Sequence, residues 1–450
     1  MAYIANTPDD VRVMLGAIGL ESLDQLFDMI PDEYRLRRPL AIPGAMSELE
    51  LTNHVGALAA MNRGADARPC FLGGGSYDHF IPAVVDNLAA RGEFYTAYTP
   101  YQAEASQGTL QATFEYQTLI AQLTGMDVSN ASLYDGGSAV SEAVLMAMTV
   151  TRRLGRVVVA GSVHPEYLQI LATNLANLAP EIVVVPHVEG RVRAADLAAA
   201  ITDDTCAVVV AYPNFFGQLE DVDRLVEAAR SRGALSIVSV DPISLGLLRR
   251  PGGYGADIVV AEGQCLGNPL AYGGPYLGIL ACRDSMVRKM PGRVVGQTVD
   301  RGGKRCFVLT LQTREQHIRR EKATSNICTN QGLLALRASI YLAAVGPGGL
   351  RKVAELSTRK AHYAAERLAE VPGLSLAFPG PFFKEFVVRS EKDPVAVLAE
   401  VGRRGYHGGI ALGRWHPELA DAILVAVTEK RTKAEIDGLA EAYRAAMGSS

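Results

Sequence analysis

Short apolar runs alternate with stretches of helical spacing from about residue 65 to residue 345. The runs that predict strands are residues 156–161, 182–186, 206–213, 235–241, 257–261 and 276–281. Helical spacing lies between most of them, as at residues 165–178 and 221–231. This strand–helix–strand repetition predicts a largely parallel sheet with helices on both of its faces.

The N-terminal residues follow a different pattern. Apolar side chains recur at helical spacing over residues 9–29, and Pro31 is expected to end this helix. Pro39 and Pro43 then mark an extended arm, which in an oligomer would embrace a neighbouring subunit.

The C-terminal residues form a third pattern. A long helical stretch at residues 348–370 is followed by strands near 384–389 and 422–428 and by a closing helix at 433–447. The predicted parts of the chain are an N-terminal helical arm (1–64), a large α/β domain (65–345) and a small C-terminal α+β domain (346–450).

Composition and charge restrict the function classes. Hydrophobic residues make up 48% of the 450 residues and charged residues 20%, which is typical of a soluble globular protein. A net charge of -4 argues against binding to nucleic acid or to an anionic membrane. The chain has neither an apolar run of ~18 residues nor a signal-peptide pattern, so we expect a cytoplasmic protein. The six cysteines and eight histidines lack metal-ligand spacing, and no metal site is predicted.

A glycine-rich helix start follows Tyr134 and Asp135. Gly136, Gly137 and Ser138 would expose backbone N–H groups at the positive end of the helix dipole, which suits a phosphate. The alternative is a helix that is only capped, by the side chain of Asp135 or Ser138.

Two further segments complete the pattern of an enzyme that uses pyridoxal phosphate (PLP). Asp241 closes an apolar strand, and the next strand is followed by Gln264 and a glycine-rich turn at 272–275. In PLP-dependent transferases of the aspartate-aminotransferase type (fold type I), such an Asp pairs with the pyridinium nitrogen and a Lys after the next strand forms the Schiff base. The chain resembles this class, and the resemblance implies a mostly parallel large-domain sheet plus a small C-terminal α+β domain.

The lysine itself is missing. Gln264 occupies its position, and no lysine occurs before Lys289. Since an amide nitrogen cannot condense with an aldehyde, we expect no covalent PLP and no catalytic residue in this chain. The alternative of a distant amine, Lys289 or Lys304, would require an unusual chain path.

His164 follows an apolar strand and precedes a helix. In PLP enzymes of this architecture an aromatic ring at this strand end stacks on the pyridine ring, and ligands bind at the carboxyl ends of parallel strands. A loop histidine that makes one hydrogen bond is the other interpretation, and the residues do not choose between them.

Two polar segments have the character of binding surfaces. Residues 92–108 place Tyr95, Tyr98 and Tyr101 at every third position among Thr, Gln and Ser, which predicts a binding surface, a subunit interface, or both. Residues 313–326 are either a solvated charge run or a segment that reaches a neighbour's phosphate.

Motifs throughout the chain resemble one family, the glycine-cleavage-system P protein, and specifically the first subunit of its two-subunit bacterial form. They are residues 71–75 (FLGGG), 95–102 (YTAYTPYQ), 114–118 (FEYQT), 130–132 (NAS), 272–275 (YGGP) and 314–326 (REQHIRREKATSN). In this family the second subunit carries the PLP lysine, so Gln264 is the expected residue here.

The resemblance implies a function and its partners. The PLP-bearing second subunit decarboxylates glycine, and the remaining aminomethyl group passes to the lipoyl arm of the H protein. Residues expected to line the partner's active site are Tyr95, Tyr98, Tyr101 and Gln107, with Arg319 and Asn326 as further candidates. A vestigial cofactor pocket is expected at Gly136, Gly137, Ser138, His164, Asp241 and Gln264. The alternative is a purely structural, non-catalytic scaffold subunit.

Overall fold

The computed structural model describes residues 5–178 and 180–448, and the chain divides into two compact units between Asn62 and Arg63. The N-terminal unit contains α1 (Pro8–Ala17) and α2 (Glu48–Ala60), each capped by a hydroxyl side chain. The predicted single helix over residues 9–29 is wrong. Helix α1 ends at Ala17 because Gly19 adopts φ +73°, and only a short 3-10 turn follows.

The second unit is built on a seven-stranded sheet in the order β1-β7-β6-β5-β4-β2-β3. The strands are β1 (Val128–Ser129), β2 (Arg156–Ala160), β3 (Glu181–Val185), β4 (Thr205–Tyr212), β5 (Leu235–Val240), β6 (Ile258–Glu262) and β7 (Gly278–Cys282). Strands β2 to β6 run parallel, whereas β7 and β1 are antiparallel to their neighbours. The prediction of a largely parallel sheet is confirmed.

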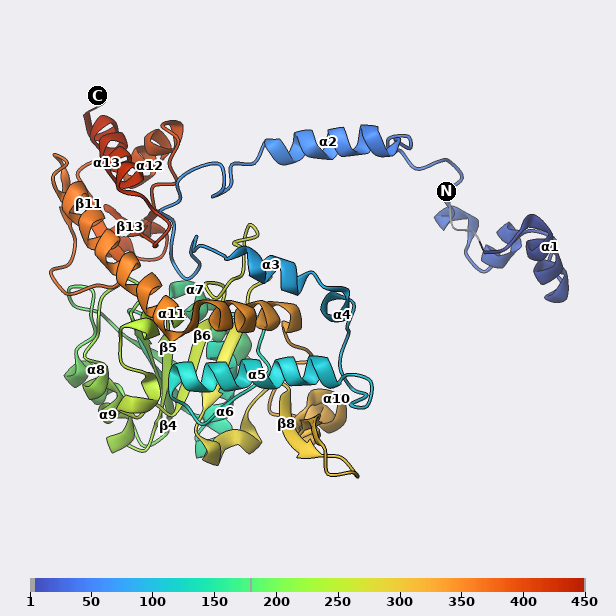
Figure 1. Cartoon of the computed structure of the whole chain (residues 1–450), viewed down its shortest axis with the longest axis horizontal. Helices are drawn as coiled ribbons and strands as arrows, with labels where there is room; N and C mark the ends of the chain where they lie inside the picture. Colours follow the sequence, from blue (N-terminus) through green and yellow to red (C-terminus); the bar gives the residue numbers. More distant parts are fainter. Residues whose placement is uncertain (1–4, 179, 449–450) are drawn as a thin grey trace. The chain divides into compact units, whose positions relative to one another are not determined.

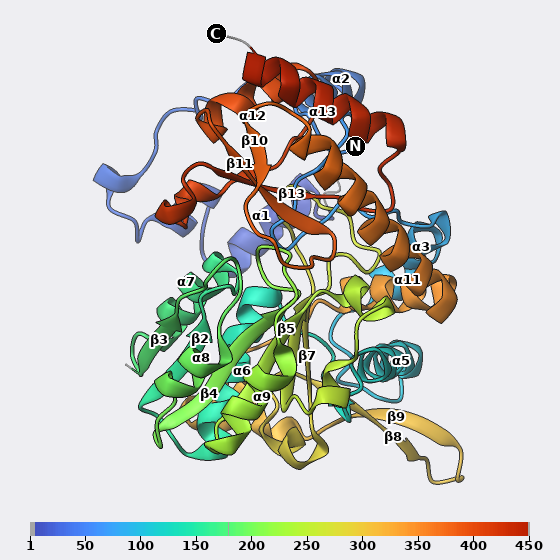
Figure 2. The same ribbon diagram turned by 90° about the vertical axis from the view of Figure 1, so that its left-hand side faces the viewer.

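Helices cover both faces of this sheet. The helices of this region are α3 (Ala83–Ala89), α4 (Gly92–Tyr95), α5 (Gln107–Thr124), α6 (Gly136–Thr151), α7 (Pro165–Leu175), α8 (Ala194–Ala200), α9 (Val222–Ser231) and α10 (Gln316–Arg319). Figure 2 shows α8 and α9 on one face and α6 on the other. The buried valines, isoleucines and alanines of the strands form one large core with α3 and with α5 to α9, as expected for strands covered on both faces.

The sequence pattern did not reveal a hairpin next to this sheet. Strands β8 (Val294–Val299) and β9 (Arg305–Thr310) pair with each other, and β9 packs against α5. Most of their side chains are not buried, so the hairpin lacks the apolar alternation that marks a strand.

Helix α11 (Gly332–Ala369) connects the sheet region to a smaller C-terminal layer (Figure 1). It is broken at Gly346, which has non-helical φ and ψ angles just before Pro347. By length and composition α11 alone among the described helices is long and apolar enough to cross a membrane. In this structure α11 is broken at Gly346 and packs against α3, α5 and α13. It therefore serves as a helix that connects two parts of the fold.

The C-terminal layer is a four-stranded antiparallel sheet in the order β10-β11-β13-β12 with two helices. Its elements are β10 (Leu374–Leu376), β11 (Glu385–Ser390), α12 (Pro394–Arg403), β12 (Ile410–Ala411), β13 (Ala422–Ala426) and α13 (Lys433–Gly448). We call this layer, together with the loops between its elements and Lys384, the small domain. It has its own apolar core.

Gly267 allows a close approach that positions the loop after β6. Its φ is +81°, and a Cβ there would lie 2.7 Å from Cβ of Tyr341 on α11. We expect Gly267→Ala to destabilise the chain by more than about 1 kcal/mol, because both the backbone and Tyr341 would have to shift. Gly253→Ala is the control, since nothing lies within 4 Å of a Cβ there. Chemical denaturation measures both variants, and equal stability would contradict this prediction.

Candidate functional site

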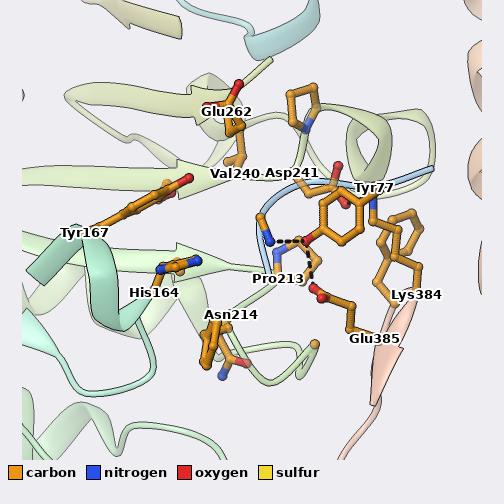
Figure 3. A pocket seen from close by; sticks show the side chains of 17 residues that line it. Tyr77, His164, Tyr167, Pro213, Asn214, Val240, Asp241, Glu262, Lys384 and Glu385 are labelled. Atoms are coloured by element: carbon orange, nitrogen blue, oxygen red, sulfur yellow. Dashed lines mark hydrogen bonds and ion pairs between the residues drawn. The ribbon is translucent and has the colours of Figure 1, made fainter. Parts of the chain in front are cut away.

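The carboxyl ends of β2, β4, β5 and β6 meet the small domain around a pocket whose cavity is about 60 Å³ (Figure 3). His164 and Asp241, which the sequence proposed for a cofactor pocket, both line it. Gln264 lies beside it and bonds to Tyr77, a lining residue. Lys384 and Glu385 enter the pocket from the small domain, and the sequence analysis gave neither a role.

Asp241 is paired with a cation of the chain itself. Nζ of Lys384 lies 2.8 Å from Oδ2 of Asp241, and their side chains are 1% and 10% exposed. The same ammonium lies 3.0 Å from Nε2 of His79 and 3.4 Å from the centre of the Tyr77 ring. A buried charge needs such partners, so Asp241 and Lys384 depend on each other.

Gln264 uses its whole amide in hydrogen bonds. Its Oε1 accepts from the backbone N–H of Tyr77 at 2.8 Å. Its Nε2 donates to the carbonyl of Tyr77 at 3.2 Å and to the carbonyl of Asn268 at 2.7 Å. The residue at the lysine position therefore fixes the backbone of the segment that contains Tyr77.

The backbone N–H groups at the start of α6 already have hydrogen-bond partners within the chain. The N–H of Gly136 donates to Oε2 of Glu262 at 2.9 Å, and the N–H of Ser138 donates to Oδ1 of Asp135 at 2.7 Å. Asp135 thus caps α6, which is the alternative that the sequence left open. The Tyr167 side chain lies so close to Gly136 and Gly137 that a Cβ on either would approach it to within 2.4 and 3.1 Å.

His164 stacks on a residue of its own helix. Its ring lies 4.5 Å from the ring of Tyr167 with an interplanar angle of 17°. Its Nε2 lies 2.7 Å from the carbonyl oxygen of Gly74, and Nδ1 accepts from the N–H of Glu166. Burial lowers the pKa of His164, so the ring is neutral at neutral pH.

The small domain holds residues 77–79 by polar contacts to each of the three side chains. The Tyr77 hydroxyl donates to Glu385 at 2.8 Å, and Glu385 also accepts from the N–H of Gly74 at 2.7 Å. Asp78 pairs with Lys430 at 2.6 Å and Arg431 at 2.9 Å, and His79 lies 2.6 Å from Glu429.

Two buried carboxyl groups near these contacts have pKa values shifted in opposite directions. Burial raises the pKa of Glu385 to about 7. Burial alone would also raise the pKa of Glu429, but the charge and hydrogen bond of His79 lower it to about 2.

A second cavity, of about 210 Å³, lies among the tyrosines of residues 92–108. Tyr95 and Tyr98 line it and are 61% and 94% exposed. The sequence missed another lining residue, the buried Arg293. Its guanidinium donates to Thr329, to Asn330 and to the carbonyl of Cys328, and lies 5.6 Å from the ring of Tyr101. Its position could not be foreseen, because an isolated arginine before a strand has no distinguishing pattern.

Three other candidates lie away from this cavity. Gln107 bonds its amide to the backbone of Phe307 on β9 and to the carbonyl of Ala103. Arg319 lines a separate basic cavity that also contains Arg288 and Lys289, and Asn326 is exposed on the loop before α11. Lys289 and Lys304, the alternative amines, do not line the pocket at Asp241.

A cluster of two histidines and a carboxylate joins the loop after β3 to the small domain. Oε1 of Glu418 lies 3.4 Å from Nε2 of His187 and 3.1 Å from Nδ1 of His416. Burial and the neighbouring His416 lower the pKa of His187. His187 lies more than 200 positions before His416 and Glu418 in the sequence, so spacing could not bring it together with them.

Comparisons with known proteins agree with this architecture. The family model "Glycine cleavage system P-protein" matches residues 1–443. The chain is 53% identical over 440 residues to the probable glycine dehydrogenase (decarboxylating) subunit 1 of Desulforamulus reducens, covering 98% of each chain. It is 52% identical over 447 residues to the protein of the same name from Thermomicrobium roseum, covering 99% of this chain and 100% of that one.

Solved structures show the same relationship. A crystal structure of glycine decarboxylase (P-protein) of the glycine cleavage system in inhibitor-bound form aligns with a TM-score of 0.92 and 45% identity, covering 99% of this chain and 100% of that one. A sphingosine-1-phosphate lyase from Burkholderia pseudomallei, 18% identical, aligns with a TM-score of 0.64 over 92% of each chain, which shows a shared fold.

The sheet, the small domain and these alignments define the chain as a PLP-dependent-transferase fold of the aspartate-aminotransferase type, as predicted. Within that class, the chain belongs to the glycine cleavage system P-protein family.

The pocket of this chain does not fit PLP. The amine is replaced by Gln264, and the carboxylate that would pair with a pyridinium already pairs with Lys384. A cavity of about 60 Å³ is also far below the roughly 300 Å³ at which ligand pockets begin.

The raised pKa of Glu385, about 7, makes the stability of the chain depend on pH. The folded chain binds this proton more tightly than the unfolded chain, whose glutamates titrate near 4.5. The contribution of Glu385 is therefore most favourable below that pH and is lost as the pH rises to about 7, by up to about 3 kcal/mol.

We expect Glu385→Gln to reduce this pH dependence by up to about 3 kcal/mol, because the variant has no proton to lose at this position. Glu142 and Glu262, whose pKa values burial also raises to about 7, keep their own contributions. Thermal unfolding at about pH 5 and about pH 8 measures the difference. Glu441→Gln, on the exposed face of α13, should behave like the wild type. A Glu385→Gln variant with the wild-type difference between the two pH values would contradict the prediction.

Proposed function

We propose that this chain is the first subunit of a two-subunit glycine dehydrogenase (decarboxylating), and that it acts on a PLP cofactor held by its partner subunit. The proposal rests on Gln264 at the lysine position. Both polar atoms of its amide are hydrogen-bonded to the chain's own backbone. The relatives named as subunit 1 support a second subunit in the enzyme.

The proposed reaction removes the carboxyl group of glycine as CO2 and passes the aminomethyl group to the lipoyl arm of a carrier, the H protein. The aminomethyl carbon bonds to one lipoyl sulfur as the lipoyl disulfide opens, and the other sulfur is reduced to a thiol. PLP on the partner supplies an electron sink for this decarboxylation. This chain supplies neither amine nor cofactor, so its contribution is to bind, orient and exclude water. A lipoyl arm is long and tethered, and a channel between two subunits would guide it.

The tyrosine cavity is the proposed wall of that channel. Tyr98 is 94% exposed in this chain alone, and Tyr95 and Tyr101 are more than half exposed. Large aromatic side chains gathered on one surface are typical of a surface that a partner covers. Arg293 lies behind them with its Nε unpaired among the described groups, which places a buried cation beside the proposed path of an anionic substrate.

The second candidate function is a scaffold that stabilises the partner and takes no part in chemistry. The apolar surface formed by α3, α5 and α11 supports an extensive subunit interface under either proposal. The two proposals differ in the tyrosines: on a scaffold they contribute burial only. Under both, the chain is a cytoplasmic protein that binds neither nucleic acid nor membrane.

Reconstitution tests the assignment as a subunit. We expect this chain alone to show no glycine-dependent CO2 exchange, and to support it when co-purified with a PLP-bearing second subunit and given a lipoylated carrier. The partner without this chain is the matched control. Decarboxylation by the isolated chain would sink the proposal, as would full activity of the partner alone.

Single Tyr→Phe variants at Tyr95, Tyr98 and Tyr101 test the channel wall. We expect at least one of them to lower kcat/KM for glycine or for the lipoylated carrier by about tenfold or more, since each removes a hydroxyl donor. Tyr406→Phe in the small domain is the control. Wild-type kinetics in all three variants would reject the lining role, and a loss of assembly with unchanged turnover of the assembled enzyme would favour the scaffold.

A further inference from the structure

The pocket at Asp241 contains a side chain of this protein at each point where a coenzyme of the PLP type would make a polar contact. PLP has a cationic pyridinium nitrogen, an aldehyde on the opposite side of the ring, and a phosphate dianion. We propose that the chain carries an internal replacement for the coenzyme, with the Lys384 ammonium in place of the pyridinium and the Glu262 carboxylate in place of the phosphate. This replacement excludes PLP and holds the small domain against the sheet.

The pyridinium end is defined by Asp241. Its Oδ1 accepts from the N–H of Ile243 at 3.0 Å, and its Oδ2 lies 2.8 Å from Lys384. Lys384 is 1% exposed and is flanked by the Tyr77 ring, whose face attracts a cation. An incoming pyridinium would meet an ammonium at the same carboxylate, so the two cations compete for one site.

Lys384 cannot serve as the missing amine. In a bound coenzyme the aldehyde lies across the ring from the nitrogen that faces Asp241. Lys384 is at the Asp241 end, whereas the amide of Gln264 occupies the position of the reactive amine. The lysine in this pocket is therefore a counter-ion rather than a nucleophile.

The phosphate end is defined by the start of α6. The N–H groups of Gly136 and Ser138, which could bind an anion, already donate to the carboxyl groups of Glu262 and Asp135. Glu262 also accepts from the N–H groups of Gln264 and Leu277, so it is fixed by three donors. A phosphate would have to displace Glu262 and would then lie beside the Asp135 carboxylate.

The internal groups also join the two parts of the fold. Lys384 and Glu385 lie at the start of β11 in the small domain, while Asp241 follows β5 of the main sheet (Figure 3). Glu385 extends the connection to Gly74 and Tyr77. In an active enzyme a bound ligand stabilises the folded state by binding it preferentially. Here covalently attached side chains make the same contacts without a ligand.

Binding of 4-deoxypyridoxine 5′-phosphate tests the exclusion, because this PLP analogue has no aldehyde and needs no lysine. We expect calorimetry with the purified full chain to show no saturable binding up to about 1 mM. Lys384→Met combined with Glu262→Ala removes both internal groups and should bring the dissociation constant at least about tenfold below that limit. Lys430→Met is the control, since Lys430 pairs with Asp78 and does not line the pocket.

Two outcomes overturn the proposal directly. One is saturable binding of the analogue by the wild-type chain with the affinity of the Lys384→Met/Glu262→Ala variant. The other is a folded Lys384→Met/Glu262→Ala variant that still fails to bind it.

Thermal unfolding keeps the proposal testable if Lys384→Met does not fold well. Lys384→Met and Asp241→Asn each leave one buried charge unpaired, whereas the double variant leaves none. We expect the double variant to recover at least half of the drop in unfolding midpoint caused by Lys384→Met alone. A double variant whose midpoint falls by the sum of the two single drops would show that the pair is not coupled and would overturn the replacement.

These measurements use this chain without its partner. Their failure would leave the glycine decarboxylation assay of the reconstituted pair unaffected, so the two proposals can fail separately.

Discussion

The buried ion pair between Lys384 and Asp241 is the interaction on which the arrangement of this chain depends. An ammonium and a carboxylate taken out of water are stable only when each compensates the other and hydrogen bonds satisfy the rest. Their contacts continue through His79 to Glu429, so a line of charged groups runs from the main sheet into the small domain. The orientation of the two domains and the content of the pocket are therefore set together.

Under the proposed replacement of the coenzyme, this arrangement accounts for a fold that stays stable without a bound coenzyme. A pocket that bound a charged coenzyme has oriented donors and acceptors that cannot be left unpaired once the coenzyme is gone. In this chain Glu262 accepts a hydrogen bond from the N–H at the start of α6, and Lys384 forms an ion pair with Asp241. Gln264 accepts a hydrogen bond from the backbone N–H of Tyr77. Each of these groups is polar, and together they leave the donors and acceptors at this sheet edge paired.

The interior pocket and the tyrosine surface of this chain differ in character. The carboxyl groups of the interior pocket, Asp241 and Glu262, are paired with donors of the chain itself. These pairings favour a rigid pocket. The tyrosines, in contrast, are exposed around a cavity that ends on the buried Arg293. Under the proposed function, this chain contributes to the chemistry at its surface, against a partner.

The sequence by itself determined the class of fold, because buried parallel strands are continuous apolar runs whose spacing does not depend on distant residues. It also determined that Gln264 cannot act as an amine, which is a property of one functional group. Element boundaries were harder to predict because they depend on the local backbone. Apolar spacing predicted a helix up to residue 29, whereas α1 ends at Ala17, just before Gly19 with its positive φ. Only the tertiary structure could assign Lys384 to Asp241 and Arg293 to the tyrosines, because these pairs are 143 and about 190 residues apart. A buried pairing is decided by which elements the fold brings together, and no periodicity along the chain records it.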